Sequence, residues 1–316
     1  MLKSVQEYQE ELKAMMGSPY CYKAANGLKV EGEDVMTDRS PWLRLKQHQL
    51  FYTKPGHREN QAKIKSFFPD NSKISERLSY CAFPDLPKTD SETESVYGVS
   101  GVRFCRVRTC PICQWRRSRM WQARAFKKLS LAIQGYPKAR YGLLTLTVRN
   151  CQVSELKGSI QDLKSGYKRL RTRLPVKNFV LGSAWSIEVT RRYDGSAHHH
   201  MHVLIMGKAS AACGRGYLSK AAWSNLWKEC MNLDYEPIVH CKWFPKKSGE
   251  DELRQLVGTL RYMTKESKIP SDRDWFRSMA KQTHGVRSIG CTGLIGKYME
   301  DPGSHDCVVF NDLLKL

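Results

Sequence analysis

The most regular hydrophobic pattern lies in the second half of the chain, where segments with strand periodicity alternate with segments of helical periodicity. Residues 141–148, YGLLTLTV, are rich in apolar and β-branched side chains and predict a buried strand. Residues 154–174 repeat apolar side chains at steps of three and four, which predicts an amphipathic helix. Two strand-like segments follow, SAWSIEVTRRY at 183–193 and AHHHMHVLIMG at 197–207.

The last two segments are separated only by a short turn that contains Asp194-Gly195, a dipeptide typical of tight hairpins. We therefore expect them to pair in antiparallel fashion. With a helix between the first strand and this hairpin, the pattern is that of an α+β protein. The sequence thus predicts a mostly antiparallel central β-sheet flanked by helices.

A further helix is expected at residues 219–232, SKAAWSNLWKECMN, which begins with Ser219, a good N-cap residue. A stripe of large side chains runs along it, and we assign this stripe to the core rather than to a site. The stripe consists of Trp223, Leu226, Trp227 and Cys230. Residues 242–251, KWFPKKSGED, are expected to form a turn after this helix.

The last predicted helix covers residues 252–267, ELRQLVGTLRYMTKES, and has one apolar side. Tyr262 comes just after the apolar residues of that side in the sequence. Lys265 and Glu266 are expected one turn further along the same helix. A tyrosine at such a position is more often an ordinary core or surface residue. The helix alone therefore assigns no role to Tyr262.

The first part of the chain predicts less regular structure, with the exception of one basic helix. Residues 114–134 contain no glycine or proline, and their basic side chains could pair with phosphates. One face of this helix holds Arg117, Trp121, Arg124 and Lys128. The alternative is a solvated face around a packed tryptophan. The candidate DNA-binding residues are Arg116, Arg117, Arg119, Arg124 and Lys128.

The composition changes near residues 135–141, so we expect two domains, 1–135 and 136–316. The 52 Lys and Arg residues against 31 Asp and Glu residues give a formal net charge of +21, which favours a polyanionic partner, above all nucleic acid. No apolar run reaches the roughly 18 residues of a membrane span, and the N-terminus lacks an apolar signal core. We expect a cytoplasmic protein with no membrane partner.

The histidine-rich strand carries a candidate metal site. Side chains alternate between faces along a strand, so His198, His200 and His202 share one face, and Glu188 and Thr190 share a face of the partner strand. Two imidazoles and a carboxylate can therefore converge. Such a set suits Mn²⁺ or Zn²⁺, and Mg²⁺ if waters complete the shell. The alternative is that these histidines are simply packed or exposed.

Four of the 11 cysteines have the spacing of a second metal site. The odd total fits a reducing compartment better than a disulfide framework. The four candidates, three of them in a C-x4-C-x2-C run, are Cys81, Cys105, Cys110 and Cys113. We expect a structural zinc ion with all four positions filled by protein. The alternatives are independent buried thiols or, less favoured, an iron–sulfur cluster.

Several of these stretches together resemble the rolling-circle plasmid replication initiators of the HUH endonuclease superfamily, in the branch with a single catalytic tyrosine. LLTLTV resembles that family's first motif, IEVT followed by HHHMHVLI resembles its metal motif, and LRYMTKES resembles its tyrosine motif. CRVRTCPICQWRRSRMW is similar to a cysteine-rich stretch upstream of the first motif in one plasmid branch. The likeness covers about residues 78 to 298.

The resemblance implies an HUH-type catalytic domain at 136–316, preceded by a helical, basic region at 1–135 with the four-cysteine zinc site. It implies that His200 and His202 bind a divalent metal, Mn²⁺ or Mg²⁺, with Glu188 as third ligand by position. Tyr262 would then attack the scissile phosphate at the origin and form a 5′-phosphotyrosine, leaving a 3′-OH primer. Lys265 could stabilise the phenolate.

One position departs from the family pattern. Relatives often carry a glutamate one helical turn before the tyrosine, thought to activate the water that releases the protein, and here that position is Gly258. We hypothesise that Glu266, or a second tyrosine such as Tyr298, takes over the release step.

The implied partners are plasmid origin DNA, as duplex and as single-stranded hairpin, and the host helicase and replication machinery of a bacterial cytoplasm. Two alternatives remain open. Related nucleases serve as transposases or conjugative relaxases, with the same chemistry in another process. A non-enzymatic, zinc-stabilised DNA-binding regulator would also explain the charge and the cysteines. It would not explain why His200, His202, Glu188 and Tyr262 occur together.

Overall fold

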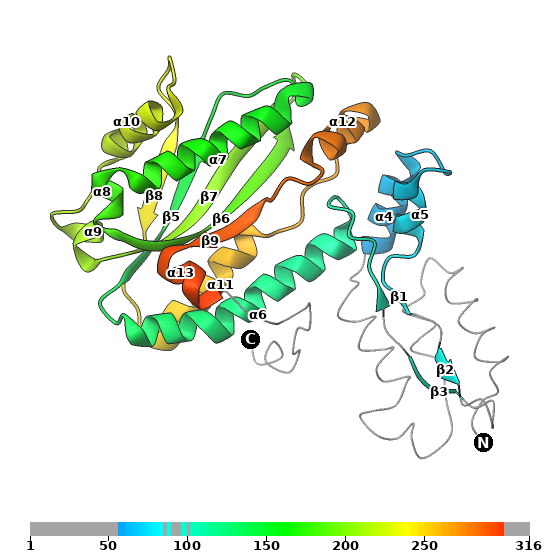
Figure 1. Ribbon diagram of the computed structural model, residues 1–316, viewed down its shortest axis with the longest axis horizontal. Coiled ribbons are helices and arrows are strands. Elements are labelled where there is room, and N and C mark those ends of the chain that lie inside the picture. Colours follow the sequence, from blue (N-terminus) through cyan, green and yellow to red (C-terminus); the bar gives the residue numbers. More distant parts are fainter. Residues whose placement is uncertain (1–55, 85–86, 90–95, 100–101, 300–316) are drawn as a thin grey trace. The chain divides into compact units, whose positions relative to one another are not determined.

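The computed structural model describes residues 56–84, 87–89, 96–99 and 102–299 (Figure 1). The chain divides into two compact units, Met1–Arg116 and Arg117–Leu316, so the division falls inside a helix. The border predicted from composition lay after that helix, at residues 135 and 136. The assignment of DNA binding to the N-terminal region and of catalysis to the C-terminal domain stays a prediction.

The first unit combines short helices with short β-hairpins. Helix α4 covers His57–Ser66 and α5 covers Lys73–Ser79, and their buried Ile64 and Leu78 form a small core. Its strands pair in two antiparallel two-stranded sheets. These strands are β1 (Phe83–Pro84) with β4 (Val102–Arg103), and β2 (Pro87–Thr89) with β3 (Val96–Val99).

A five-stranded antiparallel sheet is the centre of the second unit, with the strand order β8-β5-β7-β6-β9 (Figure 1). The strands are β5 (Arg140–Thr147), β6 (Val180–Arg191), β7 (Ala197–Gly207), β8 (Val239–Trp243) and β9 (Ile289–Thr292). The long β6–β7 hairpin turns at Asp194-Gly195, as predicted. The α+β class with a central antiparallel sheet is confirmed.

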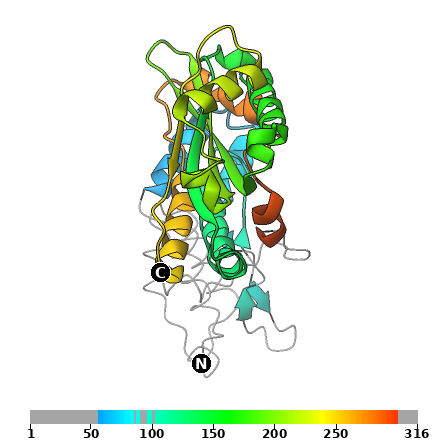
Figure 2. The ribbon, with the colours of Figure 1, turned by 90° about the vertical axis from the view of Figure 1, so that its left-hand side faces the viewer.

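Helices cover both faces of this sheet (Figures 1 and 2). On one face lie α7 (Leu156–Thr172), α10 (Lys220–Met231) and α12 (Arg273–Thr283). On the other lie α6 (Pro111–Gly135) from Arg117 onward, α11 (Gly249–Met263) and α13 (Gly293–Met299). The short elements are η2 (Val153–Glu155), α8 (Leu174–Lys177) and α9 (Ala209–Cys213).

The three inner strands β5, β6 and β7 therefore face two cores, which explains the nearly continuous apolar run in β7. The first core, on the side of α7 and α10, contains Met201, Val203 and Ile205 of β7. The second core, on the side of α6 and α11, contains Leu204 and Met206. The tryptophan stripe of α10 belongs to the first core, as predicted. Ser219 caps α10, because its side chain accepts a hydrogen bond from the N–H of Ala222.

Several elements differ from the sequence predictions. Part of the expected turn at 242–251 is the edge strand β8, and β9 and α12 were not predicted at all. Helix α11 ends at Met263, so the expectation that Lys265 and Glu266 continue it is wrong. The reason lies at Thr264, whose hydroxyl donates to the carbonyl of Leu260 and so closes the last turn.

Among the described residues, no helix combines the length and the apolar character that a membrane crossing needs.

Candidate functional site

Strand register brings the metal candidates together. Glu188 of β6 lies directly opposite His200 of β7, and His202 is the next residue of β7 on the same face. One potential ligand atom from each of the three lies within 4.8 Å of the others. All three sit on the face of the sheet that α11 covers, because the intervening Met201 points into the opposite core.

The spacing of these atoms suits one ion. The Nε2 atoms of His200 and His202 are 3.0 Å apart, and they lie 3.6 and 3.5 Å from Oε2 of Glu188. Ligand atoms about 2.1 Å from a common metal are roughly 3.0–3.4 Å apart in octahedral or tetrahedral geometry. The three residues therefore fit a divalent cation without rearrangement of the backbone.

The neighbours of this group set its orientation and charge. Thr145 of β5 lies with Oγ1 3.1 Å from Nδ1 of His202, which leaves Nε2 of that ring turned toward Glu188. Contacts with His200 and His202, and then the charge of Lys265, hold the pKa of Glu188 well below its usual range. The carboxylate is therefore ionised at neutral pH, as a metal ligand must be.

Tyr262, near the end of α11, lies beside this group. Its ring is 5.2 Å from that of His202, centroid to centroid, with the ring planes inclined by 61°. Nζ of Lys265 lies 4.5 Å from the centroid of the Tyr262 ring and 3.4 Å from Oε1 of Glu188. The tyrosine is 47% exposed, so much of its side chain is open to solvent.

The end of α11 is fixed against α6 by a buried contact. The hydroxyls of Ser118 and Thr264 are 2.9 Å apart, and Thr264 is two residues after Tyr262. No local pattern indicated this contact, which joins residues far apart in the chain. It holds the loop that carries Lys265 close to the tyrosine.

The other two histidines of the run have other partners. Nδ1 of His198 lies 2.8 Å from Oδ1 of Asn150, although this ring shares the face of His200. His199 points the other way and is buried, with Nε2 2.7 Å from the hydroxyl of Ser159. Of the four histidines, only His200 and His202 therefore join the group with Glu188.

The predicted DNA-binding side chains of α6 are all partly exposed. They are Arg116, Arg117, Arg119, Arg124 and Lys128. Trp121 packs against the second core. Burial, and then the charge of Arg261 on α11, lower the pKa of Arg119. Arg261 was not among the residues singled out from the sequence.

The two candidates for the release step lie in different places. Glu266 follows the loop residue Lys265, close in the chain to Tyr262. The hydroxyl of Tyr298 lies 3.1 Å from where a Cβ on Gly135 would be. Gly135 is separated from Ser118 by about 25 Å of α6 at 1.5 Å per residue. Tyr298 is therefore remote from Tyr262, and Glu266 is the stronger candidate.

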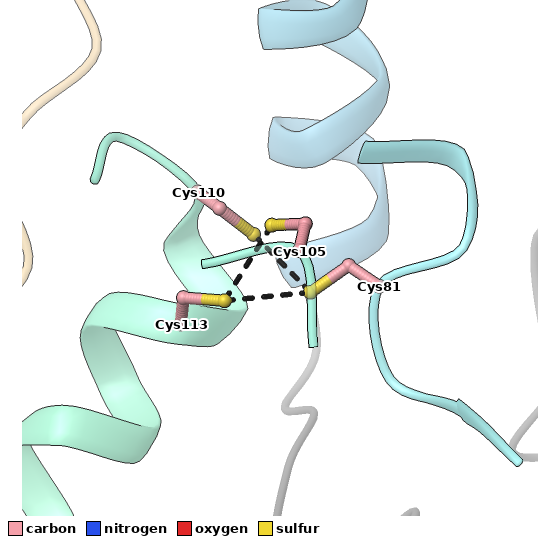
Figure 3. A group of neighbouring side chains, drawn as sticks. All are labelled: Cys81, Cys105, Cys110 and Cys113. Carbon is pink, nitrogen blue, oxygen red and sulfur yellow. Dashed lines mark hydrogen bonds between the residues drawn. The ribbon is translucent and has the colours of Figure 1, made fainter. Parts of the chain in front are cut away.

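The four cysteines of the first unit form a compact cluster (Figure 3). Sγ of Cys113 lies 3.6 Å from that of Cys81 and 3.5 Å from that of Cys105, and the sulfurs of Cys110 and Cys81 are 3.6 Å apart. A disulfide would bring two sulfurs to about 2.05 Å. All four side chains are buried, and none is bonded to another.

These distances are close to those of a tetrahedral site. Four sulfurs at about 2.3 Å from one zinc ion are roughly 3.8 Å apart. The contact with Cys105, followed by those with the other thiols and burial, raises the pKa of Cys110, because several thiolates cannot be charged side by side without a cation. The cluster can therefore hold a metal ion, and zinc fits its four thiols.

The fold and the site together define an α+β protein with a His/His/Glu group, suited to a divalent cation, beside an exposed tyrosine. A family model described as a replication protein matches residues 97–315. The chain belongs to this family of replication proteins, which confirms the resemblance to replication initiators. Its assignment to the single-tyrosine branch stays a prediction.

Individual relatives agree with the family. Protein rep of Bacillus amyloliquefaciens is 38% identical over 176 residues, 54% of this chain and 50% of the relative. Protein rep of Streptococcus pneumoniae serotype 2 (strain D39 / NCTC 7466) is 34% identical over 169 residues, 52% of each chain. Protein rep of Lentilactobacillus hilgardii is 31% identical over 301 residues, 90% of this chain and 91% of the relative.

The alignments with the first two of these relatives span about half of the relative's length. No solved structure matches the chain.

Proposed function

We propose that this protein initiates rolling-circle replication of a plasmid by nicking one DNA strand at the origin and joining itself to that strand through Tyr262. The observation that carries the proposal is the position of an exposed tyrosine beside a His/His/Glu group. Its ring lies 5.2 Å from that of His202. A phosphate between the two could be reached by both a cation and a nucleophile.

In the proposed reaction the phenolic oxygen of Tyr262 attacks the phosphorus atom, and the bond from phosphorus to the 3′ oxygen breaks. The products are a 5′-phosphotyrosine and a strand with a 3′-OH; the phenol proton passes to solvent and the leaving 3′ oxygen takes one up. A divalent cation, Mn²⁺ or Mg²⁺, held by Glu188, His200 and His202, would polarise the phosphate.

Lys265 has a separate role in this proposal. Its ammonium group lies 4.5 Å from the centroid of the Tyr262 ring, where it can stabilise the phenolate as the proton leaves. The ammonium group of Lys265 also pairs with Glu188 at 3.4 Å, so this one side chain links the proposed metal ligand to the proposed nucleophile. We assign the release step, in which the phosphotyrosine is hydrolysed or transferred, to Glu266.

The N-terminal part is proposed to bind the origin. The basic side chains of α6 would hold DNA phosphates, and a zinc ion at Cys81, Cys105, Cys110 and Cys113 would stabilise the region from which α6 begins. The proposed partners are duplex and single-stranded origin DNA and the host helicase, in a bacterial cytoplasm. Transposase or relaxase activity would use the same chemistry on other DNA.

The test is formation of a covalent protein–DNA adduct. The full chain is incubated with Mn²⁺ and supercoiled or single-stranded DNA of the replicon that encodes it, and the products are separated on a denaturing gel. We expect an adduct and a nicked strand with wild type and neither with Tyr262→Phe, which keeps the ring but removes the nucleophile. DNA binding without an adduct in wild type would favour the non-enzymatic regulator instead.

A further inference from the structure

The tip of the β6–β7 hairpin presents an aromatic side chain that the fold does not use. Tyr193 is 97% exposed, whereas Tyr217, another exposed tyrosine, is 55% exposed. A phenol ring normally buries much of its surface, because the hydrophobic gain is large. On this hairpin the ring is held out with both faces open to solvent, so either face is free to stack on a planar ligand.

The backbone under Tyr193 is well ordered by hydrogen bonds. The N–H of Gly195 donates to the carbonyl of Arg192 at 3.1 Å, and the N–H of Arg192 donates to the carbonyl of Ser196 at 3.0 Å. Gly195 has a φ of 82°, a left-handed conformation that glycine adopts without strain. Asp194 Oδ1 accepts from both the N–H and the hydroxyl of Ser196. Tyr193 therefore stands on a rigid turn.

Two contacts also fix the tip to α12. Nε1 of the buried Trp275 donates to the carbonyl of Gly195 at 2.8 Å, and Nη2 of Arg191 donates to Oδ2 of Asp272 at 2.9 Å. The hairpin end is thus held on the side of the first core while its aromatic tip stays outside. A rigid platform loses little conformational entropy when it binds a ligand.

The surroundings of Tyr193 indicate which ligand fits. Arg192, its neighbour in the chain, is exposed and basic, and the whole chain carries a net charge of +21. An open aromatic face on a basic segment of the chain is the combination that binds single-stranded nucleic acid, with a base stacked on the ring and a phosphate on a cation. Bases within a duplex are already stacked on each other and offer the ring no face.

The same two strands connect this tip to the candidate metal group. Glu188 on β6 is five residues before Tyr193. This separation is at most about 17 Å, the length of five extended residues at ~3.4 Å each, because β6 ends at Arg191 and the chain turns after it. It corresponds to about five nucleotides of a stacked strand at ~3.4 Å each, and fewer where the strand is extended. Because the metal group lies on the sheet face that α11 covers and the tip is anchored to α12 on the other face, a strand with its scissile phosphate at His200 and His202 would reach Tyr193 by passing round the end of the hairpin.

We propose that Tyr193 is a stacking platform for a base of single-stranded DNA a few nucleotides from the nick, with Arg192 binding an adjacent phosphate. The inference rests on the proposed function, because it takes the strand at the metal group as the ligand. Tyr193 is a positioning residue here, since it touches DNA away from the reacting atoms.

The test compares two fluorescein-labelled strands of about 20 nucleotides, oligo-dT and a strand of abasic sites, by anisotropy with the full chain. We expect Tyr193→Ala to weaken oligo-dT binding about tenfold, in line with the loss of one stacked base. Binding of the abasic strand should stay unchanged. Tyr193→Phe keeps the ring and should bind oligo-dT within about twofold of wild type.

Tyr217→Ala serves as the matched control and should bind both strands like wild type. The inference is overturned if Tyr193→Ala binds oligo-dT like wild type, or if it weakens the abasic strand or a duplex of the same length to the same extent. Equal thermal melting curves verify that the variants are folded. An adduct in wild type with no effect of Tyr193→Ala removes only this inference, whereas Tyr193-dependent binding without any Tyr262 adduct removes only the proposed nicking.

Discussion

The rings of Tyr262 and His202 meet edge to face, 5.2 Å apart, although the two residues belong to different elements and are separated by several others in the chain. The contact places the end of α11 over the sheet face that carries Glu188 and His200. It also brings the ring of Tyr262 beside the group that could hold a cation.

Lys265→Met should slow nicking without removing the nucleophile. The change deletes the ammonium group that lies 4.5 Å from the ring centroid of Tyr262. We expect the single-turnover rate of adduct formation to fall about ten- to a hundredfold, as for loss of one electrostatic contact in the transition state. Lys268→Met, in the same exposed loop, is the matched control. Equal rates for the two variants would contradict the proposed role of Lys265.

Loss of the imidazoles should abolish metal-dependent nicking. His200→Ala and His202→Ala each remove one of three ligands, so Mn²⁺ binding measured by calorimetry should weaken by about tenfold or more. His198→Ala is the control, because its ring shares the same face but contacts Asn150 at 2.8 Å instead. If His198→Ala is as damaging as the other two, the ligand set is wrong.

Gly258→Glu should speed the release of the protein from its covalent adduct. A Cβ at Gly258 would meet no atom within 4 Å, and the position lies one turn before Tyr262, so a carboxylate there can approach the phosphotyrosine. We expect the covalent adduct to decay faster by hydrolysis than in wild type.

Gly258→Gln is the control for this change, since it has the same size and should raise helix stability by a similar amount, up to ~1 kcal/mol. The time course of adduct loss on a denaturing gel separates the two. Identical decay in both variants would show that no water is activated from this position.

Cys113→Ser should remove bound metal and destabilise the first unit. Sγ of Cys113 contacts two other sulfurs of the cluster at 3.5 and 3.6 Å. We expect about one zinc ion per wild-type chain by elemental analysis, almost none in the variant, and faster proteolysis of the region before α6. Cys213→Ser, at an exposed cysteine, should keep the metal. A wild-type protein purified without chelator that contains no zinc would refute the site.

Tyr167 should make the second unit sensitive to alkali. Burial raises the pKa of Tyr167 to about 12, above the ordinary value near 10. Between these two pH values the unfolded chain loses this proton and the folded chain keeps it. The free energy of unfolding should therefore fall as pH rises from about 10 to 12, by at most roughly 3 kcal/mol from this group.

Urea titrations across this pH range measure the slope of the free energy of unfolding against pH. In Tyr167→Phe the slope should be shallower than in wild type, even though the variant loses the hydrogen bond to Ser183 at 2.6 Å. Tyr217→Phe, at an exposed tyrosine, should leave the slope unchanged. The prediction fails if the Tyr167→Phe and wild-type slopes coincide.

Local patterns were sufficient for the central part of the fold. Alternation along β7 placed His200 and His202 on one face, and the Asp194-Gly195 turn set the register that puts Glu188 opposite His200. The sequence did not reveal where α11 packs, because that depends on contacts such as Ser118 with Thr264, between residues far apart in the chain. The same holds for Arg261, whose proximity to Arg119 arises only when two helices meet.

The missed elements are short edge strands and a helix joined to them. β8 has an exposed or partly exposed residue at most positions, and its Lys-rich, proline-containing continuation obscures the strand pattern. Thr145 could have been found, since it occupies the same face of β5 as the histidines of β7, directly opposite His202. Its role in orienting His202 follows from pairing that the sequence alone did not specify.

The direct pairing of Glu188 with His200 has a consequence for how this protein can vary. Slipping one strand by a single residue would turn the carboxylate to the opposite face, away from both imidazoles. The number of residues in the connecting turn is therefore constrained as strongly as the ligands themselves. Inserting or deleting one residue at Arg192–Ser196 would separate Glu188 from the two imidazoles, although all three ligand residues would still be present in the sequence.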